Sequence, residues 1–401
     1  MIIRARVIVT MDGPPIENGA VAVSGNRIID VGKFPEISVH HSGQQVVDLG
    51  EQALLPGLIN AHCHLDYTCL RGKISPKKSF AHWIRAINAQ KAKLSAQDYV
   101  ASIGEGFAEA KRFGTTTIAN LTAFPELIPQ IDPPIRTWWF AELIDVRSRE
   151  QANEIVDLAI ESLKSAQNWG LAPHALFTAS KNLYGRCEKI ARREKILLTT
   201  HLAESREEMA MFHDGLGPLY DFLKSIGRPM DDCGRATPVE IFVQHFGNAP
   251  ARNDWIVAHL NELTAGDFEL LEKAKVKFHV VHSPRSHNYF AHSRFAFKRL
   301  RSLGFNICLG TDSLASNESL SLFAEMRAFR SDVPAISPKE VLEMVTVNGG
   351  RALGRPQTLG RIRANYFADL IAIPCSGITD VFEEILAFDG PVDWMTVNGR
   401  M

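Results

Sequence analysis

Short β-branched and apolar segments alternate with helical patterns through the middle of the chain, and this alternation restricts the folds that it can adopt. The candidate strands are Leu54–His64, Thr115–Asn120, Arg136–Leu143, Pro173–Thr178, Ile196–His201, Trp255–Leu260, Val276–His282 and Phe305–Gly310. Helical periodicity between most of them is typical of βα units. Eight such units over roughly 300 residues predict a (β/α)8 barrel of the α/β class. A doubly wound parallel sheet is the alternative, but no G-x-G-x-x-G motif follows an early strand.

The two ends of the chain differ from the middle, because they contain short strand-like segments separated by turns. These segments include Val7-Ile-Val-Thr10, Arg27-Ile-Ile-Asp-Val31, Ala368-Asp-Leu-Ile-Ala-Ile373 and Asp393-Trp-Met-Thr-Val397. We expect residues 1–54 and 355–401 to pair into one small β unit, which leaves residues 55–354 as the barrel domain.

An insertion around residues 205–250 lengthens the connection between the fifth and sixth strands beyond an ordinary crossover. Glycine and proline residues break it into pieces. It is either a lid over a substrate site or a structural excursion.

Charge and composition exclude several classes of protein. The chain has 401 residues, with 44 Lys+Arg against 45 Asp+Glu, so its net charge is −1. This balance gives no support for a nucleic-acid partner, and no polybasic run indicates a membrane surface. We find neither a signal peptide nor an apolar run of about 18 residues, so no membrane span is expected. The 6 cysteines lack C-x-x-C spacing, which favours reduced thiols in the cytoplasm.

Potential metal ligands and acid–base groups recur where the candidate strands end. His62 and His64 close the first strand, and residues i and i+2 of a strand point to the same face. His201 and Glu204 follow the fifth strand. His259 ends the sixth strand and Asp312 follows the eighth. Because barrel enzymes carry their catalytic groups at the carboxyl ends of the strands, these side chains are expected to meet at one mouth.

The types of these residues favour one divalent metal. Three histidines and one carboxylate suit Zn²⁺ with a coordination position left open for water. Imidazole also suits Fe²⁺ or another transition metal such as Ni²⁺, so the ligands alone do not fix the metal. Each residue also has a structural alternative, because His259 could be a core histidine and Glu204 could lie on a solvated helix turn.

A longer ordered set of motifs runs through the chain. It comprises Pro56-Gly-Leu-Ile-Asn-Ala-His-Cys-His-Leu65, Pro173-His174, His201-Leu-Ala-Glu204-Ser205, Ala258-His259-Leu260, His282-Ser-Pro-Arg-Ser286, Leu309-Gly-Thr-Asp312-Ser313 and Thr346-Val-Asn-Gly-Gly350. This set resembles the amidohydrolase superfamily, in its branch of amino-purine and triazine deaminases and chlorohydrolases. The resemblance covers nearly the whole chain. It implies a TIM-type barrel with a small β-sandwich built from both termini.

The resemblance also implies roles for individual residues. One divalent metal would be held by four residues, namely His62, His64, His201 and Asp312. Glu204 would move protons, His259 would orient and activate the attacking water, and Asp312 would pass a proton to departing ammonia. The implied reaction is hydrolytic deamination. Relatives with two metals carry a bridging carbamylated lysine at the end of the fourth strand, whereas Lys181 lies beyond that strand here, which favours one metal.

Five further residues are expected to bind substrate, namely Trp83, Arg85, His174, Arg285 and His287. Trp83 and Arg85 lie where relatives place a segment that covers the substrate, and an aromatic ring there suits stacking on a heterocycle. His174 ends the fourth strand and would line the pocket. Arg285 and His287 depart from the motif of many relatives. Arg285 could pair with a substrate carboxylate or with a structural ion-pair partner.

The leading hypothesis is therefore a metal-dependent deaminase of an amino-substituted, purine-like heterocycle or nucleoside. The text from Thr200 to Pro229 resembles the inserted stretch of aminodeoxyfutalosine deaminases, which implies a small-molecule substrate of that kind. A cyclic amide hydrolase or a chlorohydrolase on the same site is one alternative. A non-catalytic scaffold is another, and a homodimer is an open alternative to a monomer.

Overall fold

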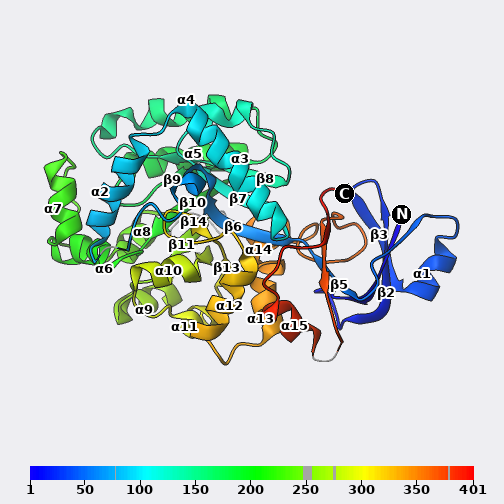
Figure 1. Ribbon diagram of the computed structural model, residues 1–401. Helices are drawn as coiled ribbons and strands as arrows, with labels where there is room; N and C mark the ends of the chain where they lie inside the picture. Colours follow the sequence, from blue (N-terminus) through cyan, green and yellow to red (C-terminus); the bar gives the residue numbers. More distant parts are fainter. Residues whose placement is uncertain (77, 247–254, 274–276, 378–379) are drawn as a thin grey trace.

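The computed structural model describes residues 1–76, 78–246, 255–273, 277–377 and 380–401. Figure 1 shows a large barrel ringed by helices on one side and a smaller sheet on the other, with both chain ends in the smaller sheet. The expected α/β barrel with a β unit from both termini is therefore confirmed. Within the described ranges, the structure has no helix long and apolar enough to cross a membrane.

Parallel strands form the barrel in the order β13-β12-β11-β10-β9-β8-β7-β6-β14. They are β6 (Leu58–His64), β7 (Thr115–Thr122), β8 (Arg136–Leu143), β9 (Trp169–Pro173), β10 (Leu197–Leu202), β11 (Trp255–His259), β12 (His279–His282), β13 (Asn306–Leu309) and β14 (Asp312–Ser313). The eighth strand of the fold is split into β13, which pairs with β12, and β14, which pairs with β6. This split strand closes the barrel. Residue 276 of the seventh predicted strand lies outside the described residues.

The junction between β13 and β14 packs tightly against the first strand. Gly310 N–H donates to the His282 carbonyl at 3.0 Å, and Thr311 N–H donates to the His62 carbonyl at 3.1 Å. A Cβ atom at Gly310 would lie 2.6 Å from the His62 carbonyl oxygen. Only glycine therefore allows this close approach at the seam of the barrel.

Two predicted strands differ from the observed ones. The fourth was expected at Pro173–Thr178, but β9 ends at Pro173 because the chain turns there, with Ala179 N–H bonded to the Ala175 carbonyl at 2.8 Å. The first prediction, Leu54–His64, spans two strands in different sheets. The chain leaves the terminal sheet at Gly57, where a Cβ atom would overlap the Thr116 side chain.

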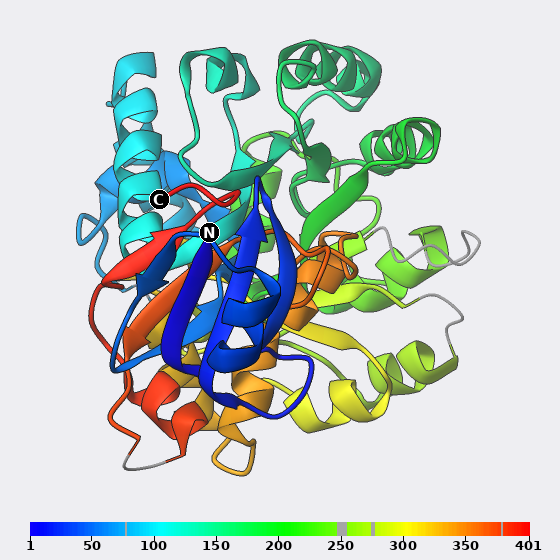
Figure 2. The same ribbon diagram turned by 90° about the vertical axis from the view of Figure 1, so that its right-hand side faces the viewer.

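The terminal sheet is mixed and has the order β16-β15-β5-β1-β2-β3, with β4 also paired to β1. Its strands are β1 (Ile2–Ile8), β2 (Ile16–Ser24), β3 (Arg27–Lys33), β4 (Val46–Asp48), β5 (Gln52–Pro56), β15 (Leu370–Pro374) and β16 (Trp394–Thr396). Residues from both chain ends share its core, in which Ile8, Leu54 and Leu370 are fully buried. Figure 2 shows this sheet facing the viewer in front of the barrel.

Helices surround the barrel, and one further helix, α1, packs on the terminal sheet. The α-helices are α1 (Phe34–His40), α2 (Phe80–Lys91), α3 (Ala96–Arg112), α4 (Ala152–Leu163), α5 (Lys181–Glu194), α6 (Arg206–Met209), α7 (Pro218–Ser225), α8 (Pro238–Phe246), α9 (Ala265–Lys273), α10 (Pro284–Phe290), α11 (Phe297–Ser302), α12 (Leu322–Asp332), α13 (Pro338–Met344), α14 (Val347–Ala352) and α15 (Val381–Ala387). Four short helical turns complete the set, namely η1 (Leu65–Leu70), η2 (Pro125–Gln130), η3 (Arg149–Gln151) and η4 (Ala210–Asp214).

The insertion between β10 and β11 contains α6, η4, α7 and α8, and residues 247–250 of its expected range lie outside the described residues. Glu207 of α6, the first helix of the insertion, caps the start of α2. The Glu207 carboxylate accepts hydrogen bonds from Phe80 N–H at 2.9 Å and Ala81 N–H at 3.0 Å. The Arg85 guanidinium lies 4.8 Å from the Phe222 ring centroid of α7. The insertion therefore packs onto the helix that carries Trp83.

Candidate metal centre and active site

Three histidines from different parts of the barrel converge at its carboxyl-terminal mouth. His62 and His64 come from β6, and His201 comes from β10. One nitrogen of each lies within 4.8 Å of the others, and the Nε2 atoms of His64 and His201 are 3.2 Å apart. Asp312 adds a carboxylate whose Oδ1 is 3.8 Å from Nε2 of both His62 and His64. The structure thus brings together the four residues that the sequence suggests as ligands.

The imidazoles at this mouth are held in the form that binds metal. Burial lowers the pKa of His62, His64 and His259 well below the usual value, so each ring is neutral and keeps a lone pair. Among the described residues, both buried ring nitrogens of His62 and the buried Nε2 of His259 have no hydrogen-bond partner. Unpartnered buried polar atoms are rare unless a bound group satisfies them. The donor set therefore fits one divalent cation.

Three residues beside the barrel mouth have a left-handed backbone conformation. Ala203, His259 and Asp312 have positive φ angles of 50°, 78° and 55°. Such conformations cost about 1–3 kcal/mol for a residue with a Cβ atom and persist where the surrounding structure enforces them. In this barrel they lie directly after β10, at the end of β11 and at the start of β14, and two of the three residues carry predicted site side chains.

Glu204 has the position of a proton carrier beside the ligand cluster. Its Oε1 lies 3.7 Å from Nε2 of His259. Burial raises the pKa of its carboxyl group well above the usual value, and the charges of Asp312 and Glu208 add to this effect. A carboxyl group with such a pKa can hold a proton near neutral pH and release it to a base.

The backbone around Glu204 is fixed by a second buried carboxylate. Glu208 accepts hydrogen bonds from Glu204 N–H at 2.7 Å and from Ala203 N–H at 3.1 Å. The Asn261 amide donates to the Glu204 carbonyl at 3.0 Å. The loop after β10 is therefore tied both to the insertion and to the loop after β11.

Asp312 is oriented by hydroxyl groups that the sequence did not suggest. Ser286 Oγ donates to its Oδ2 at 2.6 Å, and Ser316 Oγ lies 3.3 Å from the same oxygen. These bonds leave Oδ1 as the oxygen that faces His62 and His64. Serine is too common in loops for its spacing to indicate this role before the fold is known.

Two of the residues expected to bind substrate are His174, which lies beside the histidine cluster, and Trp83, which is in α2. His174 follows β9, its side chain is 23% exposed, and its Nδ1 is 2.6 Å from Thr178 Oγ1. Trp83 packs edge-on against Phe290, with ring centroids 4.9 Å apart, and stacks on Phe80.

The other three expected substrate residues have protein partners. The Arg85 guanidinium lies over the Phe222 ring of α7. The Nδ1 atom of His287 is 3.0 Å from Oδ1 of Asn261. Arg285 forms an ion pair with Glu318 at 2.9 Å and donates to Ser319 Oγ at 2.8 Å. Their roles in substrate binding stay predictions.

A buried carboxylate at the end of β8 was missed. The Oε1 atom of Glu142 lies 3.6 Å from Nδ1 of His64 and 3.9 Å from Nε2 of His174. Together with His174 and His201 it forms a second group whose ligand atoms lie within 4.8 Å of one another. The sequence held a signal for it, because Glu142 lies near the end of a predicted strand as the other site residues do.

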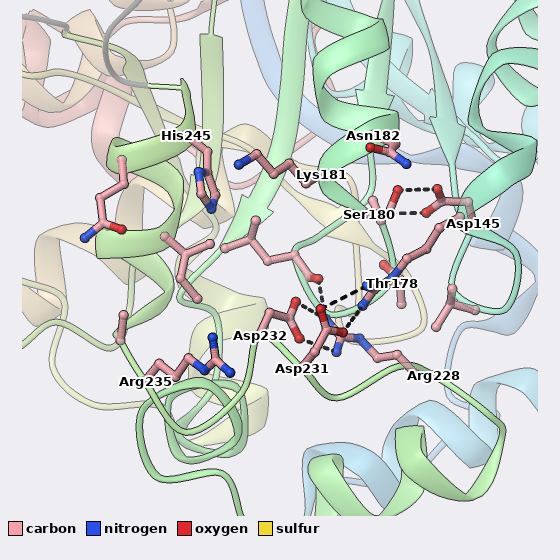
Figure 3. A pocket seen from close by; sticks show the side chains of 17 residues that line it. Asp145, Thr178, Ser180, Lys181, Asn182, Arg228, Asp231, Asp232, Arg235 and His245 are labelled. Carbon is pink, nitrogen blue, oxygen red and sulfur yellow. Dashed lines mark hydrogen bonds and ion pairs between the residues drawn. The ribbon is translucent and has the colours of Figure 1, made fainter.

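A cavity of about 490 Å³ lies beside the loop that follows His174 (Figure 3). Arg228 of the insertion lines this cavity and forms an ion pair with Asp232 at 2.8 Å. Its guanidinium also donates hydrogen bonds to the carbonyls of Leu176 and Phe177. Asp145 accepts bonds from the Ser180 amide and hydroxyl at 2.6 and 2.5 Å. These contacts fix the loop whose Thr178 hydroxyl holds the His174 ring.

Several known proteins resemble this chain over most of its length. The 5-methylthioadenosine/S-adenosylhomocysteine deaminase of Syntrophobacter fumaroxidans is 29% identical over 393 residues, which cover 90% of this chain and 81% of that protein. The structure of Helicobacter pylori aminofutalosine deaminase in complex with methylthio-coformycin has a TM-score of 0.87 at 20% identity, covering 100% of this chain and 99% of that one. Zinc-bound atrazine chlorohydrolase from Arthrobacter aurescens has a TM-score of 0.80 at 18% identity, covering 100% and 94%.

These two solved structures show a similarity of fold alone, because their sequences are only 20% and 18% identical to this chain. A sequence model described as the amidohydrolase family matches residues 53–401, which include the whole barrel and both β15 and β16. The matched range contains the four clustered ligand candidates as well as Glu204 and His259. The chain belongs to the amidohydrolase family.

Proposed function

We propose that this amidohydrolase is a metal-dependent deaminase that hydrolyses the exocyclic C–N bond of a purine-like heterocycle or nucleoside. The observation that carries the proposal is the position of Glu204. Its buried carboxyl group lies 3.7 Å from His259, and the charge of Asp312 contributes to its raised pKa. Hydrolytic deamination needs such a group, because a proton must travel from the attacking water to the ring.

The metal proposed for this site is Zn²⁺, with Fe²⁺ or another transition metal as the alternative. Its protein ligands would be His62, His64, His201 and Asp312. When bound, a divalent metal supplies Lewis acidity that makes water nucleophilic near neutral pH. The orientation of His201 suits a ligand. Its Nδ1 lies 2.8 Å from the His174 carbonyl oxygen, and its Nε2 faces the other histidines of the cluster.

The residues of the chain would divide the proton transfers between them. Glu204 would take a proton from the attacking water and deliver it to the ring nitrogen beside the carbon that bears the amine. His259, whose buried Nε2 has no hydrogen-bond partner in the part of the chain that the structure describes, would orient the water. Asp312 would accept the second proton and pass it to the departing ammonia.

The substrate class follows from the relatives together with the site. A curated relative is named for deamination of 5-methylthioadenosine and S-adenosylhomocysteine, and a relative from Methanosarcina mazei is named 5'-deoxyadenosine deaminase. Both names describe adenine nucleosides with a modified 5' carbon. We propose a substrate of this kind, with an aminodeoxyfutalosine-like compound included.

Release of ammonia from a panel of adenosine-, guanine- and pterin-type compounds tests the proposal. We expect ammonia with at least one adenine nucleoside, and none with the Glu204→Gln variant on the same compound. Silence of the zinc-loaded enzyme across the panel would contradict the deaminase reading. Appearance of chloride or a ring-opened acid from suitable substrates would favour another amidohydrolase reaction.

We also place the enzyme in the cytoplasm. All 6 cysteines are free thiols, and Cys63, Cys187, Cys308 and Cys375 are buried. Thiols of this kind persist in a reducing compartment. Labelling of the half-buried Cys69 and Cys233 with a membrane-impermeant reagent in intact and in lysed cells tests the placement, because a cytoplasmic protein would be labelled only after lysis.

A further inference from the structure

Glu142 stands out among the buried acidic side chains at the barrel mouth. Its side chain is 4% exposed, and its Oε1 has no hydrogen-bond partner in the described part of the chain. A buried carboxylate oxygen without a partner is costly, so a native structure keeps one where it has a role.

Two other buried carboxylates beside this mouth accept hydrogen bonds from backbone amides. Glu208 accepts from two N–H groups of the loop after β10. Glu325 accepts from Arg285 N–H at 3.0 Å and from the Asn317 amide at 2.6 Å. Glu142 instead faces two imidazoles, those of His64 and His174, and both distances allow a hydrogen bond after a small shift.

The orientation of His64 decides what Glu142 can do. Its Nε2 is the nitrogen that faces the cluster, because it lies 3.2 Å from Nε2 of His201 and 3.8 Å from Oδ1 of Asp312. A neutral imidazole that offers Nε2 to a metal must carry its hydrogen on Nδ1. The Nδ1 atom that would carry this hydrogen lies 3.6 Å from Glu142 Oε1.

We propose that Glu142 is a positioning residue that accepts the Nδ1–H of His64 and the Nε2–H of His174, and so orients one metal ligand and one pocket imidazole together. Carboxylates that bind the outer nitrogen of a ligand histidine fix its tautomer and raise its basicity. Glu142 acts through the two rings rather than on substrate, because its Oε1 is buried whereas the His174 side chain is 23% exposed. The inference rests on the metal site of the proposed function and not on the deamination.

Zinc affinity tests the inference independently of activity. The Glu142→Gln variant keeps the size of the side chain and removes its charge, and Glu325→Gln makes the same change at a carboxylate that binds no imidazole. Apoprotein of the wild type and both variants would be titrated with zinc in competition with a chromophoric chelator. We expect E142Q to lose affinity by about 10- to 100-fold and E325Q by less than about 3-fold. Far-UV circular dichroism checks that each variant is folded.

A conservative variant and a kinetic readout separate orientation from simple packing. Glu142→Asp keeps the charge but withdraws it by one methylene, so its zinc affinity should fall between those of the wild type and E142Q. At saturating zinc, E142Q should still show a raised KM, because the acceptor that faces His174 has lost its negative charge.

Wild-type zinc affinity in folded E142Q, or an equal loss in E325Q, would overturn the inference. An enzyme that binds zinc tightly but releases no ammonia from the panel would contradict the proposed function and leave this inference standing.

Discussion

The mouth of the barrel and the terminal sheet use burial in opposite ways. At the mouth, ionisable groups such as His62, Glu204, Glu208 and Glu325 are almost fully removed from water. In the described residues of 1–54 and 355–401, the buried polar side chains are Thr10, Asp369 and Thr396, and the rest of the core is apolar. Burying ionisable groups opposes folding, whereas burying apolar surface favours it. Burial at the mouth therefore costs stability, whereas burial in the sheet contributes it.

The largest expected effect is at the mouth. Glu204→Gln should lower kcat by about 10²- to 10⁴-fold, because the amide cannot carry a proton. The thermal unfolding midpoint should stay the same or rise, since a neutral group replaces a buried carboxyl group whose pKa burial raises. Kinetics and calorimetry on the same preparation check both statements. A large drop in the midpoint would break the comparison, because Glu204 would then serve stability as well.

An ion pair joins the terminal sheet to the amino-terminal end of the barrel, opposite the mouth, and should give the next largest effect, on stability. The Arg136 and Asp369 side chains are 8% and 5% exposed and lie 3.1 Å apart, and Arg136 also stacks 3.8 Å from the Phe367 ring centroid. Arg136→Ala should destabilise the fold by about 3–5 kcal/mol, because it leaves a buried carboxylate unpaired. Urea denaturation measures this. A loss below about 1 kcal/mol would mean that water reaches Asp369.

Loss of apolar packing in the terminal sheet should cost somewhat less. Leu54→Ala should lower the free energy of unfolding by about 2–5 kcal/mol, since Leu54 is 0% exposed. The kcat/KM of the folded fraction should not change. Val39→Ala is the matched control, because Val39 is 73% exposed and its truncation should alter stability by about 0.5 kcal/mol or less. A change in kcat/KM with Leu54→Ala would show that the sheet acts on the site.

The smallest expected effect concerns Arg285 at the rim of the mouth. Its partner Glu318 has a side chain that is 91% exposed, so Arg285→Ala should cost only about 0–1 kcal/mol of stability. If Arg285 leaves Glu318 for a substrate carboxylate, the same variant should raise KM for a carboxylate-bearing nucleoside and not for its uncharged analogue. Equal KM changes for both compounds would assign Arg285 a structural role.

The sequence predicted the barrel and the convergence of its ligands for one physical reason. In parallel strands with period-two side chains, residues at the carboxyl ends share one mouth, so the candidates at the strand ends could be expected to meet there. The choice of His62, His64, His201 and Asp312 as the metal ligands came from the family resemblance. The division of the eighth strand into β13 and β14 could not be predicted from strand periodicity, because it depends on the close approach of Gly310 to His62.

Contacts between distant segments were also beyond the sequence. The carboxylate of Glu207 caps α2 from 126 and 127 residues away, and Ser286 reaches Asp312 from another strand end. Such pairs leave no local spacing to recognise. Glu142 is an intermediate case, because its strand was predicted correctly but a single glutamate near a strand end is weak evidence without the imidazoles beside it.

The split eighth strand has a consequence for the thermodynamics of the whole barrel. Asp312 is a predicted metal ligand and also the first residue of β14, which closes the sheet against β6. A cation that joins Asp312 to His62 and His64 would thus bridge the seam, and its binding free energy would be linked to closure. Zinc at 100 times its dissociation constant would add about 2.7 kcal/mol to the stability. Chelation should then speed amide hydrogen exchange first along β6 and β14, which would show that the ion stabilises the closed barrel.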